Sequence, residues 1–189
     1  SARRFGGGID TLVHGSLTRL SGIEGRGTAR PTRRLNDLID RGRFDIVHLH
    51  NLHGYYLDFP VLLRRLGTAG TPLVWTLHDC WPMTGKCPFF GDCLAWQDSC
   101  GDCRHLDRYP KSFFDSTRTM WNRKKDLLSS LPNLTLVTPS RWLAGVVRDS
   151  FLGDREVRVI NNAVDTEVFR PLGAPKSDLR RELGLPTEG

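Results

Sequence analysis

Four short apolar runs alternate with helical patterns along this chain, and this alternation restricts the fold more than any other feature. The runs cover residues 44–50, 72–77, 133–138 and 157–160. Each is rich in β-branched and other apolar residues and is no longer than one buried strand. Strands that are separated by helices form parallel sheets with helices packed on their faces. The sequence therefore predicts an α/β fold, a Rossmann-like parallel sheet with helices on both faces.

The helices between these runs are predicted from apolar residues at helical spacing. They are expected over residues 9–20, 32–40, 58–66, 112–128 and 140–147, with a further short helix over 177–183. Ser112 and Asp115 have the spacing of a capping pair, with Phe113 on the apolar face that follows. Ser140 stands where an N-cap is expected, directly after a strand.

Polar residues gather where the predicted strands end, which is where open parallel sheets bind ligands. The candidates are His48, His50, Asn51, His53, Gly54 and Tyr55, then His78 and Asp79, then Ser140 and Arg141, and finally Asn161, Asn162 and Asp165. Such side chains can meet the hydroxyls of a sugar and a phosphate. Each also has a structural interpretation, because a histidine can satisfy loop carbonyls and Ser140 can cap a helix. A helix start at Ser140 would also offer free amides to an anion.

All five cysteines lie in one loop, residues 80–111, between the second strand and the next helix. Cys87, Cys93, Cys100 and Cys103 supply four thiolates, the number a tetrahedral structural zinc site needs. A long loop with little apolar content also needs such a cross-link. Two disulfides are the alternative, and the odd number of cysteines favours metal in a reducing compartment. Cys80 is then the spare thiol, packed near the strand end.

Positive charge is concentrated at the start of the chain, although the whole chain carries only +6. Residues 1–43 hold nine arginines and four acidic residues. A solvated, arginine-rich helix pair is one interpretation. A patch for an anionic membrane surface or a phosphate-bearing lipid is another. Nucleic acid is disfavoured because no aromatic residues interleave with these arginines. No run approaches the roughly 20 apolar residues of a membrane span.

Several motifs together resemble bacterial glycosyltransferase family 4 enzymes of exopolysaccharide assembly, of the colanic-acid type. They are HLHNLHGYY at 48–56, VWTLHDCWP at 74–82, YPKS at 109–112, VTPSRWL at 137–143 and VINNAVD at 159–165. The resemblance covers nearly the whole chain, and the combination is specific although each motif alone is weak. Ala163 is a departure, since many relatives have glycine there.

This resemblance implies a GT-B fold, in which two Rossmann-like domains face each other across a cleft. It implies transfer of a hexosyl group, with retention, from a UDP- or GDP-sugar to a glycan or polyprenyl-lipid-linked acceptor. No catalytic metal is expected. His78 matches the histidine that lies near the transferred sugar, and is the expected catalytic residue. Asn51, His53, Gly54, Tyr55, Asp79, Ser140, Arg141 and Asn162 are the expected substrate-binding residues.

The resemblance also sets expectations for organisation and location. Residues 1–170 are expected to form the acceptor-side domain without its amino-terminal portion, since the glycine-rich loop of the family is not visible. Residues 171–189 are expected to form the linker to a donor domain that this sequence lacks. The enzyme is expected in the cytoplasm, with peripheral contact to the inner membrane through residues 1–43. The rival hypothesis is a non-catalytic module that binds an acceptor or a partner and is stabilised by a structural zinc ion.

Overall fold

The four predicted strands form one parallel sheet in the computed structural model, which describes residues 6–171, 173 and 175–186. Their order across the sheet is β1 (Val47–Leu49), β2 (Leu73–Thr76), β3 (Leu134–Thr138) and β4 (Glu156–Val159). All three neighbouring pairs are parallel. Because parallel strands cannot be joined by a tight hairpin turn, each connection crosses over the sheet, and each contains a helix. The predicted α/β class with a Rossmann-like parallel sheet is confirmed, whereas side chains such as His48 and Arg158 leave one face of this sheet exposed.

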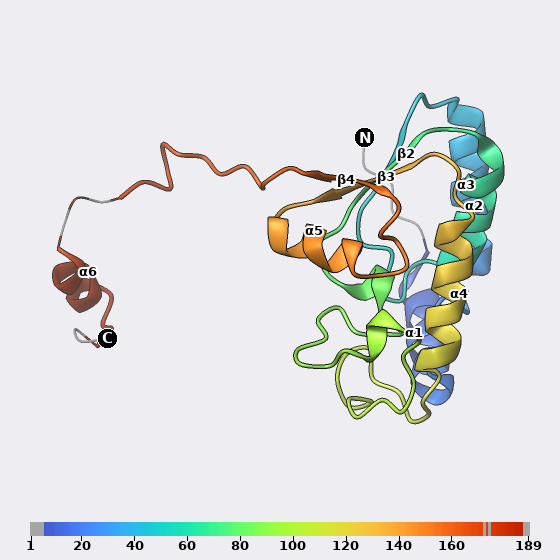
Figure 1. Ribbon diagram of the computed structural model, residues 1–189, viewed down its shortest axis with the longest axis horizontal. Coiled ribbons are helices and arrows are strands. Elements are labelled where there is room, and N and C mark those ends of the chain that lie inside the picture. Colours follow the sequence, from blue (N-terminus) through green and yellow to red (C-terminus); the bar gives the residue numbers. More distant parts are fainter. Residues whose placement is uncertain (1–5, 172, 174, 187–189) are drawn as a thin grey trace.

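Helices pack against the sheet (Figure 1). The helix α3 (Phe59–Ala69) packs between α2 (Ala29–Gly42) and α4 (Thr117–Ser129), and α5 (Arg141–Arg148) packs on β3 and β4. The remaining helix of the body, α1 (Gly8–Ser21), lies beside the long loop that follows β2. Short 3-10 turns, η1 (Trp81–Met83) and η2 (Ala95–Gln97), are the regular elements within that loop.

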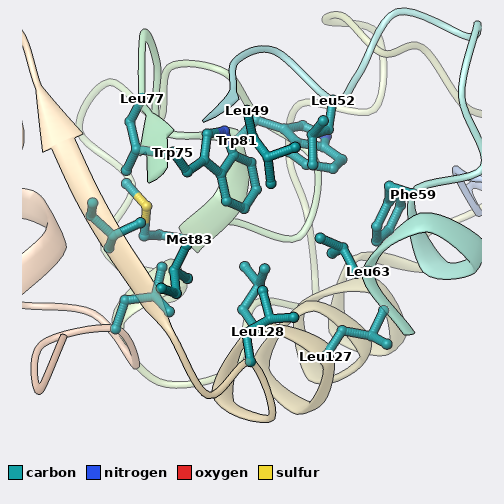
Figure 2. Close-up of a cluster of buried hydrophobic side chains, with 14 of the residues drawn as sticks. Leu49, Leu52, Phe59, Leu63, Trp75, Leu77, Trp81, Met83, Leu127 and Leu128 are labelled. Atoms are coloured by element: carbon teal, nitrogen blue, oxygen red, sulfur yellow. The ribbon is translucent and has the colours of Figure 1, made fainter. Parts of the chain in front are cut away.

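The core lies between the sheet and the helices α3 and α4 (Figure 2). Strand residues such as Leu49 and Trp75 meet Leu63 of α3 and Leu128 of α4, each 6% exposed or less. Trp81, from the loop after β2, is 1% exposed in the same core. Full burial of such side chains stabilises a fold by roughly 2–3 kcal/mol each. The start of the loop is therefore part of the core, not a surface excursion.

Two predicted boundaries were wrong. The run 44–50 was expected to be a buried strand, but β1 spans only three residues and stands at the edge of the sheet. Phe44 and Ile46 are consequently 54% and 57% exposed. The helix predicted from Ser112 begins at Thr117, and Phe113 is 60% exposed. Asp115 acts locally instead, because its Oδ1 accepts from the backbone N–H of Thr117 at 2.9 Å.

The chain leaves the sheet after β4 as an extended segment that ends in α6 (Lys176–Glu182), apart from the rest of the molecule (Figure 1). Every described residue from 158 to 178 is exposed. This is the behaviour expected of a linker, although the proposed domain boundary stays a prediction. In the part of the chain that the structure describes, no helix has the length and apolar character needed to cross a membrane.

A buried histidine makes the stability of the α1–α2 region depend on pH. His14 is 2% exposed, its Nδ1 lies 3.0 Å from Thr28 Oγ1, and its Nε2 accepts from the N–H of Gly25 at 3.0 Å. Burial lowers the pKa of His14 to about 4. Because the unfolded chain binds this proton first, stability falls as the pH falls from about 6.5 towards 4, by about 3 kcal/mol in all.

Urea unfolding at several pH values checks this expectation. The His14→Gln variant keeps an acceptor for Gly25 but cannot gain a proton, so the difference between the two proteins isolates the histidine. If the free energy of unfolding changes equally with pH in the wild type and in the variant between pH 6.5 and 4, His14 is not the cause of the pH dependence.

Candidate functional site

Three histidines meet at the carboxyl ends of β1 and β2. The Nε2 atom of His48, within β1, lies 2.8 Å from Thr76 Oγ1 of β2. Just after the strands, His50 Nδ1 lies 2.9 Å from His78 Nε2, and their rings stack at 5.2 Å. All three histidines are exposed. Burial, and then the charges on His48 and His78, lower the pKa of His50, so a neutral imidazole that accepts or donates hydrogen bonds is favoured here.

A second polar group lies beside the histidines and deeper in the fold. His53 Nε2 lies 2.7 Å from Asp79 Oδ2, with 13% and 21% of the two side chains exposed. Asp79 Oδ1 accepts from the N–H of Trp81 at 2.9 Å. The other nitrogen of His53, Nδ1, lies 3.4 Å from the hydroxyl of Tyr109. Tyr109 comes from the far end of the cysteine-rich loop, so that loop returns to the strand ends.

A buried lysine and a buried glutamate both contact Trp81, the residue whose backbone N–H donates to Asp79. Lys124 of α4 is 1% exposed, and its Nζ donates to the carbonyls of Trp81 at 2.8 Å and Thr84 at 3.0 Å. The same ammonium lies 3.6 Å from the centre of the Trp81 ring. Glu24, 4% exposed, accepts from Trp81 Nε1 at 2.9 Å through Oε2. The indole of Trp81 is thus held from two sides.

The pKa values of this pair move in the directions that burial dictates. Burial raises the pKa of Glu24, although Lys124 opposes the shift, and burial lowers the pKa of Lys124 to about 8. The ammonium therefore remains charged at neutral pH. Glu24 Oε1 is buried and has no hydrogen-bond partner among the described residues.

Sequence reasoning missed three of these residues: Tyr109 as a site residue, Glu24 and Lys124. Lys124 alone left a usable signal. It falls on the face of α4 that Met120, Trp121 and Leu127 bury, where a lysine must find partners. Glu24 lies in a glycine-rich loop, and nothing in its neighbourhood indicates burial.

The remaining predicted residues lie in two places. Asn51, Gly54 and Tyr55 follow β1, close to the histidines. Ser140, Arg141 and Asn162 follow β3 and β4, at the other half of the same sheet edge. Ser140 caps α5, because its Oγ accepts from the N–H of Leu143 at 3.2 Å, so its structural interpretation is confirmed. Arg141 and Asn162 are exposed.

The four candidate zinc cysteines line one cavity of about 180 Å³ in the loop. Cys87 and Cys103 share a hydrogen bond, which lowers the pKa of Cys103 to about 6. Cys100 Sγ accepts from the N–H of Gly85 at 3.2 Å. Nevertheless, across the described residues no group of three or more His, Cys, Asp or Glu side chains is arranged to hold a metal ion. Zinc at this position stays a prediction. Cys80 is 1% exposed, as expected of a spare packed thiol.

Lysine ammonium groups perform part of the cross-linking that was predicted for metal. Lys86 is 4% exposed, and its Nζ donates to the carbonyls of His105, Leu106 and Arg108 at 3.0–3.2 Å. A cation among three carbonyls ties the end of the loop to its beginning. Together with Lys124, it fixes the segment that carries Asp79 and the segment that carries Tyr109.

Comparison with known proteins adds an independent finding. The model of the family described as Glycosyltransferase Family 4 matches residues 4–168. Over 127 residues the chain is 32% identical to WcaC of Escherichia coli (strain K12), which is described as a candidate colanic acid biosynthesis glycosyl transferase. That match covers 64% of this chain but spans only 31% of the length of the relative. No solved structure matches.

Proposed function

This chain belongs to Glycosyltransferase Family 4, and on that premise we propose that it forms the acceptor side of a glycosyltransferase active site. The reaction is transfer of a hexosyl group, with retention, from a UDP- or GDP-sugar. The acceptor is a glycan or a polyprenyl-linked sugar in exopolysaccharide assembly. The observation that carries the proposal is the contact of His50 with His78 at the ends of two adjacent parallel strands.

In this proposal the exposed histidines face the donor. His78 hydrogen-bonds the transferred sugar or its phosphate, and His50 orients the His78 ring through their 2.9 Å contact. Catalysis then consists of positioning and of stabilising the charge that develops on the leaving diphosphate. His53, Tyr55 and Asn51 shape the acceptor side, and Ser140, Arg141 and Asn162 bind at the other half of the edge. No metal takes part in the chemistry.

We also propose that the chain is completed by further segments. The donor domain would follow the extended segment after β4. An additional βα unit would cover β1, because no strand among the described residues pairs with its outer edge. Beside β1 lies a groove of about 440 Å³ lined by apolar residues that include Leu35, Ile39, Phe44 and Ile46. An open strand edge beside an apolar groove supports such a covering unit.

The proposed location is the cytoplasmic face of the inner membrane. One face of α1 carries Ile9, Leu12 and Leu20, which are 80%, 70% and 58% exposed. The first 43 residues of the sequence, which include this helix, hold nine arginines. An exposed apolar stripe next to basic residues supports peripheral binding to an anionic membrane surface.

The test of the role of His78 is a single substitution in the longer protein that contains both halves of the cleft. We expect His78→Ala to lower turnover at least about tenfold, as loss of one positioned polar contact would. His105→Ala is the matched control, because Lys86 binds only the backbone carbonyl of His105. Equal turnover of the His78 variant and the control contradicts the role of His78.

The rival function is the non-catalytic module. The same assay separates the two functions. Transfer by the longer protein and none by the 189-residue chain agrees with our proposal, whereas no transfer by either protein, with any UDP- or GDP-sugar supplied, favours the module.

A further inference from the structure

Tyr109, His53 and Asp79 form a hydrogen-bonded chain that runs from the surface into the fold. Tyr109 is 43% exposed, whereas the side chains of His53 and Asp79 are 13% and 21% exposed. The contacts are 3.4 Å between Tyr109 and His53, and 2.7 Å between His53 and Asp79. Two loops contribute: His53 follows β1, and Asp79 and Tyr109 come from opposite ends of the long loop that follows β2.

The donors and acceptors in this series of hydrogen bonds have a defined order. Asp79 accepts from the Trp81 N–H through Oδ1, so its Oδ2 is left to accept from His53 Nε2–H. His53 Nδ1 then carries a lone pair, and the Tyr109 O–H donates to it. This arrangement leaves the oxygen lone pairs of Tyr109 free to accept a hydrogen bond from outside. Burial, followed by the effect of Tyr55, raises the pKa of Tyr109 to about 12, so the phenol remains protonated at neutral pH.

A second tyrosine stands beside it in a strained backbone conformation. Tyr55 has φ of 66°, and it follows Gly54, which has φ of 112°. An aromatic residue in the left-handed region costs about 1 kcal/mol or more, and such strain concentrates at binding sites. The strained turn sets the Tyr55 ring edge-on to Tyr109 at 5.8 Å and against His14 at 5.7 Å. The Tyr55 and Tyr109 rings therefore lie side by side at the exposed end of these hydrogen bonds.

We propose that Tyr55 and Tyr109 form a binding site for a pyranose ring, whose hydroxyl donates to the Tyr109 oxygen. His53 and Asp79 are positioning residues, since they act through Tyr109. The sugar's apolar face packs on the tyrosine rings, and its hydroxyl meets the one oriented polar group. That this sugar belongs to the acceptor glycan rests on the proposed function, in which the exposed His50 and His78 face the donor. The cysteine-rich loop supplies Tyr109, which gives this loop a direct role in substrate choice.

The test is saturation-transfer NMR on the 189-residue chain with the methyl glycosides of glucose, galactose, mannose and fucose. We expect at least one glycoside to bind to the wild-type protein. Tyr109→Phe removes only the hydroxyl and should weaken this binding about fivefold, which corresponds to one net hydrogen bond. Tyr109→Ala should abolish the binding. Tyr56→Phe is the matched control. The Tyr56 hydroxyl donates to the carbonyl of Asn51 and takes no part in the hydrogen bonds that link Tyr109, His53 and Asp79.

The positioning role has its own readout. Asp79→Asn should change the tautomer of His53, seen as a shift of its ring ¹⁵N signals, and should weaken glycoside binding as Tyr109→Phe does. Binding of none of the four glycosides, or equal binding by Tyr109→Phe and wild type, overturns the site. Transfer by the longer protein is measured separately. Transfer without glycoside binding refutes this inference alone, and glycoside binding without transfer refutes the proposed function alone.

Discussion

Lys124→Met is expected to lower the free energy of unfolding by about 3 kcal/mol, because two buried carbonyls lose a charged hydrogen-bond donor. The methionine matches the lysine in size, so packing changes little. The carbonyls of Trp81 and Thr84 lose their donor, and each unpaired buried acceptor costs about 1–3 kcal/mol. Glu24 also loses the cation whose charge most lowers the pKa of its carboxyl group. The variant no longer buries a charged ammonium group, and avoiding that desolvation cost offsets part of this loss.

Urea denaturation of the variant and of Lys125→Met measures the effect. Lys125 is the next residue of the same helix, but it is exposed, and its contact is an ammonium 5.1 Å from the Trp121 ring. The control should therefore lose less than about 1 kcal/mol. Equal stability of the two variants would show that the lysine is not a structural cation.

The sheet could be predicted from the sequence because its strands are short, apolar and separated by clear helical patterns. The placement of His50 and His78 followed from topology alone, since the ends of adjacent parallel strands meet at one edge. The edge position of β1 could not be predicted. A run such as 44–50 is equally apolar whether or not a second strand pairs with its outer edge. Its composition therefore does not show which strands will be its neighbours.

The cysteine-rich loop contains contacts that could not be predicted from the sequence. The density of thiols indicated zinc or disulfides, and zinc stays a prediction, but the loop is also held by Lys86 and Lys124, whose carbonyl partners are up to 43 residues away. Contacts from a side chain to distant backbone carbonyls leave no pattern in a sequence, because every residue has a carbonyl. The role of Tyr109 was missed because its 3.4 Å contact joins it to a side chain, His53, that lies 56 residues away in the sequence.

Gly85→Ala is expected to destabilise the protein by about 3 kcal/mol, the upper end of the effect of an overpacked core. Gly85 lies where the loop crosses the first turn of α4. A Cβ atom at this position would stand 2.4 Å from the carbonyl oxygen of Thr117 and 2.7 Å from its Cβ. Backbone atoms of a helix cannot yield as a flexible side chain does, so the loop itself must move.

The matched control is Gly145→Ala in α5, where the added Cβ meets no atom within 4 Å. Alanine in a helix is favoured over glycine, so this variant should gain up to about 1 kcal/mol. Urea unfolding gives both values, and limited proteolysis between residues 85 and 111 reports whether the loop has moved. Because the segment around Gly85 connects Trp81 and Lys86, its displacement should also separate Asp79 from Tyr109. The ¹⁵N signals of His53 would then shift in Gly85→Ala and not in Gly145→Ala. Unchanged stability and unchanged signals in Gly85→Ala would mean that α4 does not fix the loop.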